Sequence, residues 1–218
     1  MNSLLRFPLA FLLLTFPCSS YGETSAEANI DGYMHCDLHN LVACQNTNQI
    51  FNGLRDRTSK HRYAKTAFPK AISHFLNGAP KYHTGKYSFS ASQVAQESLW
   101  GPGERYQFPS GELLFDGFTP HDAPDCAAVI FDSKGKILLI AILNRDDSNS
   151  RDSLYRHVLR IYTHDEKPKP EFVQHLQNWA RGVVDNLSGY PGLPKDTFGG
   201  TQYIVRTTGA RWTKEQEP

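Results

Sequence analysis

The sequence has almost no excess of one charge, because its 218 residues include 23 Lys and Arg against 22 Asp and Glu. A nucleic-acid-binding protein needs a broad basic surface, and binding to an anionic membrane needs clustered cations, so neither partner is predicted. Hydrophobic residues make up 39% and charged residues 21% of the chain, which is typical of a folded globular protein. Two classes remain, namely enzymes acting on small molecules and proteins that bind other proteins.

Several common catalytic and cofactor motifs are also absent. There is no Gly-x-Ser-x-Gly nucleophile motif and no Cys-x-x-Cys or His-Glu-x-x-His metal motif. Gly101-x-Gly103 lacks the third glycine of a dinucleotide-binding loop. Two groups bring metal-ligand residue types together without a recognised spacing: His35, Cys36, Asp37 and His39, and His121, Asp122, Asp125 and Cys126. We therefore predict no metal and no cofactor, and we expect that the protein is not an enzyme.

Long apolar runs are lacking except for one near the start of the chain. Residues 1–22 contain Arg6, then an apolar run from Leu9 to Phe16, and then the small residues Ser20 and Gly22. This is the layout of a secretory signal peptide cleaved after Gly22, and the run is too short to span a bilayer. We expect a periplasmic or secreted protein without a membrane anchor.

Cysteines are few, and three remain beyond the predicted signal peptide: Cys36, Cys44 and Cys126. An odd number allows at most one internal bridge and leaves one thiol over, in a compartment where disulfides form. Cys36 and Cys44 are near each other in the sequence, so we predict that they pair, with Cys126 as the alternative partner of either.

Apolar periodicity predicts an α+β fold. Two stretches, Tyr63 to Leu76 and Pro170 to Leu187, each carry an apolar stripe at helical spacing. The apolar runs 127–131 and 136–143 flank Asp132-Ser133-Lys134-Gly135, which predicts a β-hairpin. Further strands are expected at 155–163 and 201–207. We predict an antiparallel β-sheet with this central hairpin and with helices packed against it.

The same patterns define the expected domain organisation. Residues 23–60 are predicted to be an N-terminal extension, residues 61–213 a single α+β domain, and residues 214–218 a tail. Within the domain, residues 81–111 are rich in Gly, Ser, Pro and aromatic residues and are interpreted as a long connecting region with short strands.

One segment directly before the hairpin is a candidate binding site. Residues 116–126 contain Pro120-His121-Asp122 between Gly117 and a second proline, which predicts a stiff exposed loop presenting His121 at its tip. A stiff loop loses little entropy on docking, which suits insertion into the cleft of another protein. In the alternative interpretation Asp122 caps backbone amides and His121 faces water. The candidate target-binding residues are Phe118, Thr119, Pro120, His121 and Asp122.

This segment resembles the inhibitory loop of the Ivy family, which are periplasmic inhibitors of vertebrate-type (C-type) lysozyme. Family members carry Cys-Lys-Pro-His-Asp-Cys just before a strand, a turn and a strand, and this chain has Phe118-Thr119-Pro120-His121-Asp122-Ala123 before its predicted hairpin. Phe118 and Ala123 stand where the family has cysteines, and Thr119 stands in place of its lysine. The resemblance implies an inhibitor that occludes the active-site cleft of a cell-wall hydrolase such as lysozyme with this loop.

Two other functions remain as alternatives. A periplasmic immunity protein that neutralises a secretion-system toxin would have the same size and export signal, and it could also block its target with a loop. An exported hydrolase would use Cys126 or a His/Asp constellation as its catalytic group. The predicted partner is therefore a protein, either a lysozyme-like hydrolase or a cognate toxin.

Overall fold

The computed structural model describes residues 41–47, 50, 67–84, 87–101, 103–119, 125–146, 155–187, 195–206 and 211–216. A seven-stranded sheet with the order β3-β4-β5-β6-β7-β8-β9 forms its centre. The strands are β3 (Arg105–Gln107), β4 (Leu113–Phe118), β5 (Cys126–Phe131), β6 (Ile137–Arg145), β7 (Arg156–Thr163), β8 (Thr197–Arg206) and β9 (Trp212–Gln216). Neighbouring strands pair antiparallel, except for the parallel pair β7–β8. The predicted α+β fold is confirmed.

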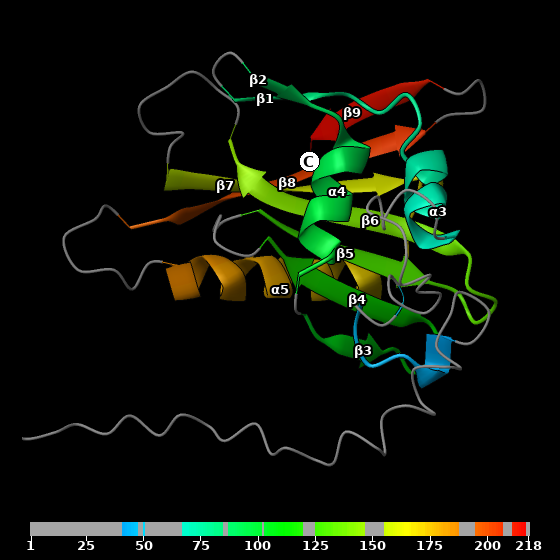
Figure 1. Ribbon diagram of the computed structural model, residues 1–218. Helices are drawn as coiled ribbons and strands as arrows, with labels where there is room; N and C mark the ends of the chain where they lie inside the picture. Colours follow the sequence, from blue (N-terminus) through cyan, green and yellow to red (C-terminus); the bar gives the residue numbers. More distant parts are fainter. Residues whose placement is uncertain are drawn as a thin grey trace, which may run out of the picture.

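Helices cover both faces of the sheet (Figure 1). On one face lie α3 (Ala67–Phe75), α4 (Ala91–Leu99) and a small two-stranded sheet of β1 (Tyr82–Thr84) and β2 (Tyr87–Phe89). On the other face lies α5 (Pro170–Leu187), which packs with a second cluster of buried apolar side chains. Because both faces are covered, all six residues of β5 are buried.

The predicted central hairpin is the β5–β6 pair. Its turn is held by the Asp132 carboxylate, which accepts hydrogen bonds from the backbone N–H groups of Lys134 (2.9 Å) and Lys136 (2.8 Å). Gly135 has φ of 78°, a backbone conformation in which a side chain would be strained. The aspartate and the glycine together therefore fix the turn as the sequence predicted.

The second predicted helix returns the chain to a parallel strand. The observed α5 has the predicted bounds, with Pro170 in its first turn, where the missing N–H is not needed. Passing along one face of the sheet, it carries the chain back to the starting end of β7, so that β8 pairs parallel with β7. This crossover explains the one parallel pair in the otherwise antiparallel sheet.

Three segments differ from the sequence-based prediction. The interpreted connecting region 81–111 contains α4, in which the Ser90 side chain caps the helix by accepting a hydrogen bond from the Gln93 N–H at 3.1 Å. The strand β4 occupies Leu113–Phe118, so the segment 116–126 is not a loop throughout. Residues 214–216 belong to β9 and pair with β8, although a tail was predicted from 214.

The segment before α3 contributes to the core. Leu41, Cys44 and Ile50 are buried in the apolar cluster that also contains α3 and α4. The guanidinium of Arg105 on β3 donates hydrogen bonds to the carbonyl oxygens of Val42 (2.8 Å) and Cys44 (3.2 Å). The described part of the predicted N-terminal extension is therefore packed against the domain.

Candidate functional site: the base of the β4–β5 loop

The predicted binding loop connects two central strands of the sheet. The last paired residues of β4 and β5 are Phe118 and Cys126. Just beyond them, the Thr119 N–H donates a hydrogen bond to the Asp125 carbonyl oxygen at 3.0 Å. The residues between them, 120–124, include Pro120, His121 and Asp122 and lie outside the described residues.

The end of β4 is held against the segment that follows α4. A Cβ added at Gly101 would lie 1.6 Å from the carbonyl oxygen of Phe118, so the two backbones approach as closely as only glycine permits. At the end of α4, the hydroxyl oxygens of Ser98 and Thr119 lie 3.3 Å apart and share a hydrogen bond. The backbone that leads into the loop is thus held by β5 through the strand pairing and by α4 through these contacts.

Asp116 ties the same strand to its other neighbours. Its carboxylate accepts a hydrogen bond from the Glu104 backbone N–H and another from the Trp179 side chain on α5, while its own N–H donates to the Glu104 carbonyl oxygen at 3.1 Å. Burial raises the pKa of Asp116 above 3.8, and these hydrogen bonds oppose that rise. Asp116 therefore braces the strand that leads to the loop.

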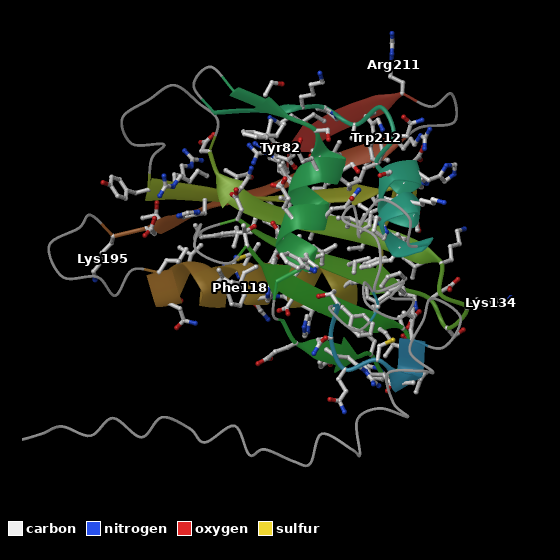
Figure 2. All side chains as sticks on the ribbon, in the orientation of Figure 1. Tyr82, Phe118, Lys134, Lys195, Arg211 and Trp212 are labelled. Carbon is white, nitrogen blue, oxygen red and sulfur yellow. The ribbon has the colours of Figure 1, made fainter. Side chains whose placement is uncertain are left out.

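Aromatic surface is exposed at the loop base. Phe118 is 47% exposed and Trp100, which follows the last residue of α4, is 40% exposed. Figure 2 shows Phe118 on the side of the molecule away from Lys134, which lies in the β5–β6 hairpin turn. Because Gly101 packs against Phe118, the segment carrying Trp100 passes directly beside the start of the loop.

Cys126 is a free, buried cysteine and does not fit the role of a nucleophile. Burial, together with the negative charges of Asp116 and Asp125, raises the pKa of Cys126 to about 12. The thiolate is the reactive form, so this thiol is not activated at neutral pH. The hydrolase hypothesis loses its cysteine on this ground.

The disulfide prediction is resolved in part. Because Cys126 is free, it is not the alternative bridge partner of Cys36 or Cys44, and that alternative was wrong. Cys44 is disulfide-bonded. Cys36 lies outside the described part of the chain, so the Cys36–Cys44 pairing stays a prediction.

The predicted metal-ligand groups are mostly beyond the described residues. This holds for His35, Cys36, Asp37 and His39, and also for His121 and Asp122. Among the residues that the structure describes, no group of three or more His, Cys, Asp or Glu side chains is arranged to hold a metal ion. Likewise, no helix in the described ranges has the length and apolar character needed to cross a membrane.

Buried polar pairs that the sequence did not reveal lie across β6, β7 and β8. The fully buried His157 places Nε2 at 2.7 Å from Asp196 Oδ1, and the buried Arg160 donates a hydrogen bond to Asn144. The Arg160 guanidinium also lies 5.0 Å from the centre of the Tyr82 ring. These residues are distant in sequence and follow no local motif, so only the pairing of the strands brings them together.

One feature of the loop base did have a sequence signal. Ser90 precedes Gln93 by three residues, and Val94, Ala95 and Leu99 follow at helical spacing, which is the pattern of a capped amphipathic helix. This signal could have located α4 and, with it, Trp100 at the end of that helix.

Comparisons with family models, with curated proteins and with solved structures found no match for this chain. The candidate site therefore stands on the geometry of the described residues on either side of 120–124: the braced end of β4, the Thr119–Asp125 hydrogen bond, and the exposed side chains of Phe118 and Trp100.

Proposed function

We propose that this protein is an exported inhibitor that places the loop containing Phe118, Thr119, Pro120, His121 and Asp122 in the active-site cleft of a cell-wall hydrolase such as C-type lysozyme. The observation that carries the proposal is the fixed base of this loop. Strand pairing ends at Phe118 and Cys126, the hydrogen bond from Thr119 to Asp125 follows, and the Ser98 hydroxyl holds Thr119 from the side.

A fixed base favours insertion into a preformed cleft. Ordering a flexible loop on binding costs conformational free energy, and a loop whose ends are already held avoids part of that cost. In the Ivy family, two cysteines close the corresponding loop. Here the Phe118–Cys126 strand pairing and the contacts of Thr119 hold the ends, which offers a physical substitute for the missing disulfide.

The chemistry of the loop tip suits a glycosidase cleft. Such a cleft contains two carboxyl groups, one protonated through burial and one ionised. An imidazole between them can donate a hydrogen bond to each, and the negative charge favours its protonated form. In this mechanism His121 occupies the position of the scissile bond, while Asp122 orients the ring or braces the loop backbone.

The test is inhibition of C-type lysozyme by the mature chain and by its His121→Ala variant. We expect the parent chain to inhibit, and the substitution to weaken inhibition by about 2 kcal/mol or more, which is a factor of about thirty, because it removes a central interface side chain. The matched control is His74→Ala, since His74 is exposed on α3 and lies away from the loop. Absence of inhibition by the parent, or equal inhibition by parent and His121→Ala, would contradict the proposal.

A further inference from the structure

Exposed aromatic side chains are concentrated at the loop base. Among the described residues, four large apolar side chains are exposed: Val42, Trp100, Tyr106 and Phe118. Gly101, which follows Trp100, packs against the backbone of Phe118, so the backbone that carries Trp100 passes beside that of Phe118. Large aromatic side chains that remain in contact with water are typical anchors of protein interfaces.

The chain around these aromatics is strongly acidic, although the whole protein is nearly neutral. Residues 87–133 contain a single basic residue, Arg105, and seven acidic residues: Glu97, Glu104, Glu112, Asp116, Asp122, Asp125 and Asp132. The rest of the chain holds the other 22 Lys and Arg residues. Charge is therefore segregated along the sequence, and its negative part coincides with the segment that builds the loop base.

Two of these acidic groups lie near Cys126, the strand partner of Phe118, and a third lies beside Asp116. Asp116 and Asp125 are both near enough to Cys126 to raise its pKa, and Glu104 contributes in the same way to the raised pKa of Asp116. Glu104 follows the Trp100–Gly103 segment directly and is exposed. Arg105, the single cation of this segment, directs its guanidinium at the 41–47 segment, where it donates hydrogen bonds to neutral carbonyl oxygens and keeps its positive charge.

Glu97 adds a further negative charge at a position that does not favour the helix. It is exposed in the last turn of α4, three residues before Trp100. The C-terminal end of a helix carries a partial negative charge, so an acidic side chain there is mildly destabilising. Its carboxylate accepts a hydrogen bond from the Gln93 side chain one turn earlier at 3.1 Å, which offsets part of that cost, and its charge is exposed at the surface.

We propose that Trp100, Glu97 and Glu104 extend the docking surface beyond the loop, and that the partner protein presents a cationic surface around its cleft. This inference rests on the proposed function and specifies the chemistry of the partner. Opposite charges on the two rims raise the rate of association, while the aromatic anchors slow dissociation. The two contributions are therefore separable in a kinetic experiment.

The experiment measures association and dissociation rate constants of the mature chain with purified C-type lysozyme by surface plasmon resonance at low and high salt. We expect the double variant Glu97→Gln/Glu104→Gln to associate about fivefold more slowly at low salt and to depend less on salt. Trp100→Ala should instead raise the dissociation rate constant about tenfold.

The matched control is Glu166→Gln. Glu166 is exposed and follows the end of β7, where Thr163 pairs with Leu139 near the start of β6. Phe118 pairs with Cys126 of β5, which pairs with Leu143 near the other end of β6. Glu166 therefore lies at the end of the sheet opposite Phe118. The contrary result is equal rate constants for the double variant and Glu166→Gln in an experiment where His121→Ala does weaken binding. That result would overturn the inference of a cationic partner surface and leave the proposed function intact. No binding by the parent chain would contradict the proposed function and this surface together.

Discussion

Gly101 controls how closely the segment after α4 approaches the start of the loop. A Cβ at this position would overlap the Phe118 carbonyl oxygen, which is backbone and cannot rotate away. Any larger residue must push the segment carrying Trp100 away from β4. The loop base therefore depends on one residue type at one position, for a reason that is steric.

We predict that Gly101→Ala destabilises the protein by more than about 3 kcal/mol, because relieving the overlap requires backbone movement. Gly182→Ala is the matched control. Gly182 lies on α5 with no atom within 4 Å of an added Cβ, so alanine should stabilise that helix by about 0.5–1 kcal/mol. Urea-induced unfolding of both variants measures the two effects, and a neutral Gly101→Ala would show that the segment moves freely.

At the scale of elements, His164 joins the end of α3 to β9. Its ring stacks on Phe75 at 4.2 Å between centroids and lies 5.6 Å from Trp212, while its Nε2 is 3.1 Å from the Phe75 carbonyl oxygen. Trp212 in turn donates a hydrogen bond from its ring N–H to the Asn77 carbonyl oxygen at 2.9 Å. These contacts hold α3 in place at the end of the sheet away from the loop.

The pKa of His164 is lowered from 6.5, chiefly because the ring is partly removed from water. Nearby Arg206, Lys136 and His74 lower it further, and the hydrogen bond to Phe75 opposes the change. Partial burial lowers the pKa of His175 on α5 in the same direction. Near pH 6 the folded protein therefore binds fewer protons at these sites than the unfolded chain does.

It follows that stability should fall as pH decreases below 6.5, with no contribution from these histidines well above that value. We predict that His164→Gln gives a flatter dependence of the free energy of unfolding on pH between 7.5 and 5.5, in urea titrations at each pH. His74→Gln should flatten the dependence much less, because His74 is exposed on α3 and acts on His164 only through its charge. An unchanged slope for His164→Gln would mean that the His164 ring of the parent protein has the same pKa in the folded and the unfolded state.

For the whole molecule, the segment 41–50 decides how much of the chain forms the folded unit. Leu41 is 5% exposed and its neighbour Val42 is 65% exposed, so the two adjacent apolar residues have opposite environments. Burial of Leu41 with α3 and α4, together with the hydrogen bonds from Arg105, joins this segment to the rest of the domain.

We predict that Leu41→Ala costs about 2–4 kcal/mol of stability, because it leaves a cavity in the core. Val42→Ala should change stability by less than about 0.5 kcal/mol, since its side chain is largely in water. Thermal or urea-induced unfolding of the two variants provides the comparison. Equal, small effects would show that residues 41–50 are a detachable extension after all.

Local patterns located most of the secondary structure. The apolar stripe of α5, the Asp132–Gly135 turn and the alternation in β7 are each encoded within a short stretch, so the sequence was sufficient to place them. In the candidate site, the sequence identified Phe118 and Thr119 because they adjoin Pro120-His121-Asp122. It did not predict that Gly101 packs against Phe118 or that Ser98 shares a hydrogen bond with Thr119. Ser98 and Gly101 are about twenty positions away, and no periodicity links them to these residues.

The sequence by itself determined the α+β class, the central hairpin and the long helix, because turn residues and apolar spacing act over a few positions. Tertiary structure decided the rest: the parallel pairing of β8, the burial that holds the Cys126 thiol protonated, and the close approach of Gly101 to the Phe118 backbone. Each depends on burial or on contact between distant segments, and these exist only after the strands and helices have packed.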